Sequence, residues 1–261
     1  MNESCCGCGS CSTNNVEEAV KRFYGQIWAN QKEDAPKENR ESTDPAKIAH
    51  EALLEELAPK KGMHVLDIGS GSGETVLAIA EKVAPTGKAV GVDLTPEGIA
   101  SSRKKAKQRK LDRVAEFYQT NAMKLPLPND SFDAVISECV VNLIPDKQEA
   151  LNEKVRVLKP GGRVIMHDVV HWMPMPRAMR ENSELYCECV GGAVSIDEYV
   201  EMMKKAGLTN IKTVDFTKYV KKVINADAFT DLDDEEFQEI VNFVRKGGIG
   251  YALLTGTKRS T

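Results

Sequence analysis

The stretch that most constrains this chain runs from Met63 to Gly73 and reads Met-His-Val-Leu-Asp-Ile-Gly-Ser-Gly-Ser-Gly. Its apolar first half has the length of a buried strand, and three glycines then alternate with serines. A helical pattern of apolar residues follows directly, between Val76 and Val83. Glycines let a ligand approach the backbone, and a helix start offers free N–H groups. The stretch therefore predicts a nucleotide-type cofactor site.

Two carboxylates near this turn indicate which cofactor it binds. The dinucleotide fingerprint Gly-x-Gly-x-x-Gly/Ala is not met, because Gly69-x-Gly71 places Glu74 in the third slot. Asp67, just before the turn, would repel a pyrophosphate but would favour an ammonium group. Asp93 ends the next apolar run, about 20 residues further on, where a carboxylate reaches ribose hydroxyls. S-adenosylmethionine (SAM) has the ammonium group and no phosphate, so we predict a SAM site.

Composition narrows the class of protein. The 261 residues predict one domain, with or without a terminal appendage, and 41% hydrophobic content is enough for a sizeable core. The net charge of −4 gives no basis for a nucleic-acid-binding surface. We find no apolar run of membrane-spanning length and no apolar core of a signal peptide. We therefore expect a cytoplasmic protein with neither nucleic acid nor membrane as a partner.

The seven cysteines are unevenly distributed. Four lie in the first eleven residues, and three lie far along the chain: Cys5, Cys6, Cys8 and Cys11, then Cys139, Cys187 and Cys189. In a reducing compartment such clustering indicates soft-metal binding or redox chemistry rather than a disulfide framework. The alternative is an incidental flexible tail.

Two helices are expected ahead of the glycine turn. The first presents a broad apolar and aromatic face from Val16 to Trp28, with Asn15 and Glu18 as an N-cap pair. We interpret this face as covering the cofactor site, and a helix that only completes the core is about as good an interpretation. After a polar linker, a second helix is expected to begin at Pro45.

Strands and helices alternate after the turn, which predicts a parallel sheet covered on both faces. Further strands are expected at 88–93, 114–119, 132–138, 162–169, 210–219 and 250–257, and helices at 96–109, 147–158, 196–206 and 231–245. Lys159 to Gly162 is interpreted as a helix stop and a turn, and Ser195 with Glu198 as a capping box. The fold class is thus α/β, a Rossmann-like, seven-stranded, mostly parallel sheet with helices on both faces, preceded by a cysteine-rich tail and a helix.

Several blocks resemble one family, the arsenite methyltransferases that use SAM. Val65–Gly73 and Gly91–Glu97 look like its first two motifs, and Ile136–Lys147 resembles its Ser-Asn-Cys-Val-Ile-Asn-Leu block, with Glu138 in place of asparagine. Glu188–Ala193 resembles the segment that holds the late arsenic-binding cysteine, whereas Arg156–Gly162 is common to many class I methyltransferases. We therefore divide the chain into a cysteine-rich tail, covering helix and linker at 1–44 and, as the resemblance implies, a SAM-dependent methyltransferase domain at 45–261.

The resemblance also implies site residues. Cofactor-binding residues would be Asp67, Gly69, Ser70, Gly71, Gly73, Asp93, Leu94, Asn121, Ala122 and Glu138. Only Cys189 matches an arsenic-ligand position of the family, since Gln31–Lys61 and the residues after 189 contain no cysteine. We assign Cys5 and Cys6 to arsenic binding with Cys189, and Cys8 and Cys11 to redox recycling; the reverse assignment of the tail stays open. Cys139 is interpreted as a small packed residue rather than a ligand.

The implied reaction is methylation of trivalent arsenic, supplied as arsenite or its thiol adducts. Arsenic held by thiolates keeps a lone pair that attacks the SAM methyl group, so no general base is required. A thiol reductant such as thioredoxin or a small thiol would reopen any disulfide formed. Two alternatives remain: a methyltransferase for a small organic acceptor, with His167 or His171 as the base, and a non-catalytic thiol-rich metal or metalloid binder.

Overall fold

The computed structural model describes residues 13–30, 45–216 and 234–260. The tail cysteines Cys5, Cys6, Cys8 and Cys11, the linker and the proposed domain boundary at residue 44 lie outside the described residues. Assignments made for them stay predictions.

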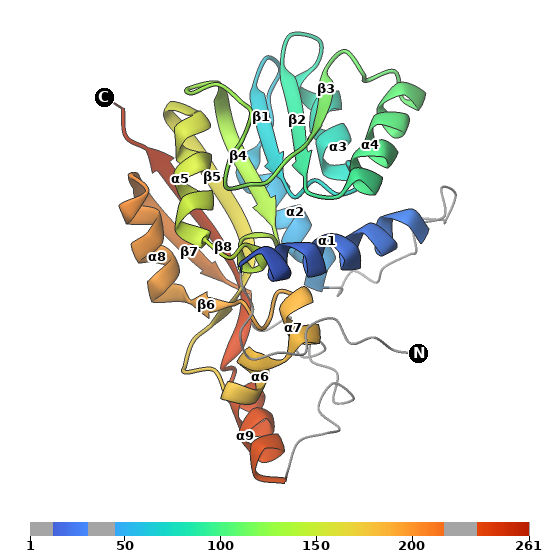
Figure 1. The fold of residues 1–261 in the computed structure, drawn as a ribbon. Coiled ribbons are helices and arrows are strands. Elements are labelled where there is room, and N and C mark those ends of the chain that lie inside the picture. Colours follow the sequence, from blue (N-terminus) through green and yellow to red (C-terminus); the bar gives the residue numbers. More distant parts are fainter. Residues whose placement is uncertain (1–12, 31–44, 217–233, 261) are drawn as a thin grey trace.

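The described residues build one mixed sheet with the order β3-β2-β1-β4-β5-β8-β7, in which β6 pairs with β5 (Figure 1). The strands are β1 (His64–Ile68), β2 (Lys88–Asp93), β3 (Ala115–Gln119), β4 (Phe132–Glu138), β5 (Leu158–His171), β6 (Val194–Ser195), β7 (Leu208–Asp215) and β8 (Ile249–Lys258). Only β8 runs antiparallel to its neighbours β5 and β7. The predicted α/β fold is confirmed, and the two-residue β6 is the one described strand that the prediction lacks.

Helices cover both faces of this sheet (Figure 1). They are α1 (Thr13–Asn30), α2 (Pro45–Leu57), α3 (Glu74–Val83), α4 (Pro96–Gln108), η1 (Val141–Leu143, a 3-10 turn), α5 (Lys147–Val157), α6 (Arg177–Glu181), α7 (Ser183–Cys187), α8 (Ile196–Lys205) and α9 (Asp234–Arg245). Strand alternation separates the two cores: Leu66 and Ile68 pack with α5 and α8, whereas Val65 packs with α2, α3 and α4. None of the described helices is long and apolar enough to cross a membrane.

Two local predictions are wrong. Helix α1 begins at Thr13, so Asn15 lies within its first turns and cannot be the N-cap. Lys159 to Gly162 does not form a separate turn but belongs to β5, which starts at Leu158 directly after α5. The extra residues are accommodated by a register shift against β4, where Phe132 pairs with Leu158 and Ala134 with Arg163. The capping box of Ser195 and Glu198 is confirmed at the start of α8.

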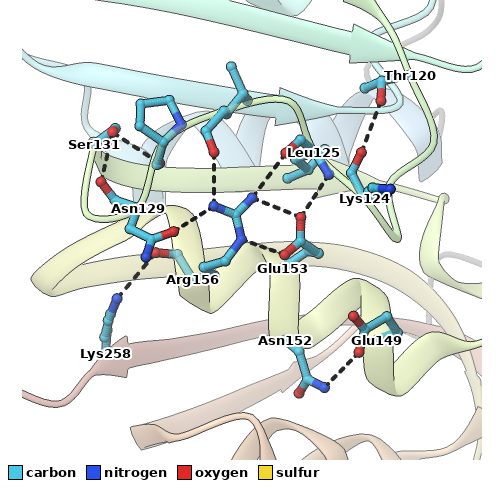
Figure 2. Close-up of polar contacts among 12 residues, drawn as sticks. Thr120, Lys124, Leu125, Asn129, Ser131, Glu149, Asn152, Glu153, Arg156 and Lys258 are labelled. Atoms are coloured by element: carbon cyan, nitrogen blue, oxygen red, sulfur yellow. Dashed lines mark hydrogen bonds and ion pairs between the residues drawn. The ribbon is translucent and has the colours of Figure 1, made fainter.

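Helix α5 also fixes the loop between β3 and β4. The Arg156 guanidinium donates a hydrogen bond to the carbonyl of Leu125 at 3.0 Å (Figure 2) and another to the carbonyl of Leu127 at 2.8 Å. It also pairs with Glu153, whose carboxylate accepts a bond from the Leu125 amide at 2.7 Å. Arg156 therefore connects two carbonyls of this loop to α5. The same loop begins with residues 120–123, which line the cavity described next.

Candidate active site

A cavity of about 610 Å³ lies at the carboxyl ends of β1, β2 and β4. Its wall contains nine of the ten predicted cofactor residues, from four separate segments: Asp67, Gly69, Ser70 and Gly71, then Asp93 and Leu94, then Asn121 and Ala122, and finally Glu138. The tenth, Gly73, does not line the cavity. A Cβ there would lie 2.6 Å from the Cβ of Ser102, so this glycine allows α3 to start close to α4.

The glycine turn is held by the carboxylate of Asp93. Its Oδ2 accepts the backbone N–H of Gly71 at 2.8 Å, while Oδ1 accepts the N–H of Thr95 at 2.8 Å and its hydroxyl at 2.6 Å. Gly71 has a φ of 50°, and a Cβ on it would lie 2.5 Å from the Trp28 ring. Asp93 thus joins β2 to the turn and, with about four lone-pair sites on a carboxylate, keeps acceptor capacity toward the cavity.

The cavity has an acidic corner. Asp67 is buried, and burial, together with the charges of Glu138 and Asp93, raises its pKa to about 7. Glu138 in turn contacts Nδ1 of His50 at 3.1 Å, and this hydrogen bond raises the pKa of His50. A buried carboxylate with so high a pKa gains from a nearby cation. The corner therefore fits the positively charged methionine end of SAM.

Helix α1 covers this cavity. Glu17 Oε2 accepts a bond of 2.7 Å from the amide of Asn121, and Trp28 packs against the glycine turn. Near the middle of the helix, the Tyr24 hydroxyl donates to the Cys187 carbonyl at 3.0 Å. All three side chains line the cavity. Of the two interpretations of this helix, covering the site is confirmed, and Val20 in addition packs into a core cluster with Leu143.

Two cysteines meet at the end of the cavity. Cys139 follows β4 and lines the cavity, and the thiol of Cys189 donates a bond of 2.9 Å to its carbonyl. The two sulfurs and a carboxylate oxygen of Asp168 all lie within 4.8 Å of one another. Contact with Cys189, together with burial, raises the pKa of the Cys139 thiol well above its usual value. Cys139 was interpreted from the sequence as a packed residue rather than a ligand, so its proximity to Cys189 was not predicted.

Neighbouring polar groups set the geometry of the pair. The Asn142 amide donates to the carbonyls of Val169 (2.7 Å) and Cys189 (3.2 Å). Both cysteines adopt a left-handed backbone, with φ of 52° at Cys139 and 67° at Cys189, a conformation that costs energy outside glycine. The predicted strands 132–138 and 162–169 place Cys139 and Asp168 at the same edge of the sheet, although the second strand continues to His171. The sequence contains no such signal for the chain fold that brings Cys189 to them.

The histidines considered as bases do not lie at the cavity. His167 is 2% exposed and stacks on Tyr251 with 4.9 Å between ring centroids, and burial lowers its pKa to about 4. His171 Nδ1 lies 3.0 Å from the carbonyl of Met173. Among the described residues that line the cavity there is no histidine.

Comparison with known proteins identifies the family. A family model for a methyltransferase domain matches residues 59–207. An arsenite methyltransferase of Halobacterium salinarum is 36% identical over 173 residues, which cover 66% of this chain and 44% of that protein. An arsenite methyltransferase of Aquipseudomonas alcaligenes is 30% identical over 234 residues, covering 77% of this chain and 64% of that protein. The chain thus spans less than two thirds of the length of these relatives.

A solved structure supports the fold. A putative sarcosine dimethylglycine methyltransferase from Galdieria sulphuraria superposes with a TM-score of 0.70 at 18% identity, covering 92% of this chain and 98% of that one. The family match and the sheet order agree with a cavity whose residues fit SAM. The chain therefore belongs to the methyltransferase-domain family and is a member of the class I SAM-dependent methyltransferases.

Proposed function

We propose that this chain transfers the methyl group of SAM to trivalent arsenic bound by cysteine thiolates. The observation that carries the proposal is the pair of thiols, Cys139 and Cys189, whose sulfurs lie within 4.8 Å of each other. Cys139 lines the cavity, and Cys189 is buried behind it. Relatives at 30% and 36% identity are named arsenite methyltransferases, which supports the same acceptor.

Residues of the acidic corner and the glycine turn would hold the cofactor. Asp67 would pair with its ammonium group, and Asp93 would accept hydrogen bonds from its ribose hydroxyls. When bound, SAM supplies an electrophilic methyl group on a sulfonium. Helix α1, fixed by the contact between Glu17 and Asn121, would keep water away from the site.

The thiols would serve as soft ligands for the acceptor. Trivalent arsenic prefers thiolate sulfur, and each As–S bond to Cys139 or Cys189 would replace one As–O bond of arsenite, whose hydroxide leaves with the thiol proton as water. Arsenic bound in this way keeps its lone pair and has no proton to lose before it attacks a methyl group. A general base is therefore unnecessary, which agrees with the lack of histidine among the described cavity-lining residues. The main work of the protein is to hold the reacting atoms about 3–3.5 Å apart.

Further thiols complete the proposal. Within the described residues, two sulfurs lie within 4.8 Å of each other, and we assign the third sulfur ligand of arsenic to the Cys5–Cys6 pair of the tail. Methylation takes arsenic from the trivalent to the pentavalent state, and its return requires two electrons. Oxidation of two thiols, Cys8 and Cys11, to a disulfide would supply them, and a thioredoxin-like protein or a small thiol would reduce that disulfide.

The direct test is product analysis. The purified full-length chain is incubated with SAM, arsenite and a small thiol, and the arsenic species are separated and quantified. The proposal expects methylated arsenic together with one S-adenosylhomocysteine for each methyl group transferred. If SAM is bound but no methylated arsenic forms with any added thiol, the acceptor is not arsenic.

A further inference from the structure

A third ligand-type group lies beside the two thiols, and methylation of arsenic does not use it. Asp168 at the end of β5 is fully buried, and one of its oxygens lies within 4.8 Å of both sulfurs. Burying a carboxylate is costly unless it is paired or bound to a cation. Its position beside the thiol pair places it where it can also bind a cation.

Hydrogen bonds hold this carboxylate in place and leave part of it free. Oδ2 accepts bonds from the Tyr199 hydroxyl (2.8 Å) and the Val141 amide (3.1 Å), and Oδ1 accepts one from the adjacent Val169 amide (3.2 Å). About four lone-pair sites are present on a carboxylate, so acceptor capacity remains. Fixed outer partners of this kind orient carboxylates that bind metal ions.

The mixture of donors selects the ion. Trivalent arsenic favours sulfur alone, whereas Zn²⁺ accepts thiolate sulfur and carboxylate oxygen in one tetrahedral site. With Zn–S bonds of about 2.3 Å, two sulfurs of a tetrahedron are about 3.8 Å apart. The donor atoms lie within 4.8 Å of one another, so side-chain rotations that shorten the distances between them by about 1 Å would bring them to zinc-binding separations.

Charge is balanced at the same place. Two thiolates and a carboxylate carry three negative charges, of which Zn²⁺ neutralises two. Lys154 is fully buried, interacts with the charge of Asp168 and contacts the Ser137 hydroxyl. Lys147 also interacts with the charges of Asp168 and Cys189, and the two ammonium groups together offset the remaining negative charge. A buried cluster without this balance would be strongly destabilised.

We propose that Cys139, Cys189 and Asp168 form a three-ligand Zn²⁺ site whose fourth position opens toward the cofactor cavity through Cys139. Binding releases two thiol protons to solvent and changes no oxidation state. Zinc and a trivalent arsenical compete for the same thiols, so the zinc-bound chain is closed to arsenic.

The test uses a full-length reference variant in which Cys5, Cys6, Cys8 and Cys11 are all serine, so that the tail does not bind metal. Zn²⁺ is titrated against a coloured chelator, and Co²⁺ serves as a spectroscopic probe of thiolate ligands. SAM binding checks that each variant is folded. We expect one zinc per chain and sulfur-to-cobalt charge-transfer bands, both lost in Cys189→Ser and both kept in the matched control Cys187→Ser.

Asp168→Asn is the decisive variant. Loss of an outer partner of a ligand already costs about 10- to 100-fold in metal affinity, so loss of this direct ligand should weaken zinc binding at least about tenfold. Adding phenylarsine oxide, which bridges two thiols, should release the zinc. The proposal is overturned if the reference variant binds no stoichiometric zinc, or if Asp168→Asn binds it as tightly as the reference. Neither the zinc stoichiometry nor the zinc affinity depends on whether the chain methylates arsenite.

Discussion

The thiol of Cys189 donates a hydrogen bond of 2.9 Å to the backbone carbonyl of Cys139, which lies 50 residues earlier in the chain. The contact joins the end of β4 to the segment that follows α7, and it brings a second sulfur within 4.8 Å of the sulfur of Cys139, a residue that lines the cofactor cavity. The predictions below follow from this pair and from the acidic groups beside it.

Asn142 is predicted to hold Cys189 close to Cys139, because its side-chain amide donates hydrogen bonds to the carbonyls of Cys189 and Val169. Each such bond contributes about 0.5–1.5 kcal/mol, so Asn142→Ala should loosen the segment that holds Cys189. The substitution is made in the reference variant, in which Cys5, Cys6, Cys8 and Cys11 are serine. Its affinity for phenylarsine oxide should fall about tenfold, since 1.4 kcal/mol corresponds to a factor of ten in affinity, while SAM affinity changes little. The exposed Asn152→Ala is the control. Equal capture by both variants would remove Asn142 from this role.

SAM affinity should depend on pH through Asp67, whose pKa is raised to about 7 by burial, Glu138 and Asp93. Below this pH the carboxyl is protonated and offers no charge to the cationic cofactor. Affinity should therefore rise as the pH increases through about 7, and Asp67→Asn should lower it and flatten this rise. Deprotonation of His50 acts in the same direction, so His50→Gln is measured alongside. Calorimetry that finds the same slope in Asp67→Asn would contradict the assignment.

Asp93→Ala should weaken SAM binding about 10- to 100-fold, because hydrogen bonds to a charged group are worth about 1.5–3 kcal/mol. The same side chain also holds the Gly71 amide, so part of the loss would come from the turn itself. Thr95→Val separates the two effects, since it removes one internal bond of Asp93 and leaves the carboxylate in place. Calorimetry with unchanged affinity in Asp93→Ala would exclude the residue from the cofactor site.

Deleting residues 1–12 should leave SAM binding intact and abolish tight arsenite binding. Helix α1 begins at Thr13, so the truncation keeps the helix that covers the cavity. A site with three sulfurs would lose its one tail ligand and retain only Cys139 and Cys189. Full arsenite affinity in the truncated chain would mean that the tail takes no part and that the sulfur ligands lie among the three later cysteines.

Much of the fold could be predicted from local patterns. The strand at 88–93 is observed with the predicted bounds, and the turn before α3 has its three glycines at positive φ. Short elements escaped prediction because five residues, as in α6 and α7, contain too little periodicity to distinguish a helix from a loop. The start of β5 at Leu158 also escaped prediction, because it depends on pairing with β4 rather than on the local Pro-Gly-Gly sequence.

The cofactor site was more accessible to sequence analysis than the thiol site. Asp67 and Asp93 follow from their places at the ends of adjacent strands, which any parallel sheet brings to one edge. Cys189 reaches Cys139 only because the chain after α7 folds back and is bonded by Asn142. That contact depends on tertiary packing between distant segments, and the spacing of the cysteines contains no sign of it.

The central claim is that Cys139 and Cys189 together hold the arsenic that is methylated. The most direct measurement is a single-turnover assay of arsenite methylation by Cys139→Ser and Cys189→Ser, with Cys187→Ser as the matched control and SAM affinity measured for each. Serine keeps the size of the side chain but replaces a soft ligand with a hard hydroxyl. Methylation should be lost in the first two variants and kept in the third, with SAM binding preserved in all three. Normal methylation by either Cys139→Ser or Cys189→Ser would contradict the claim.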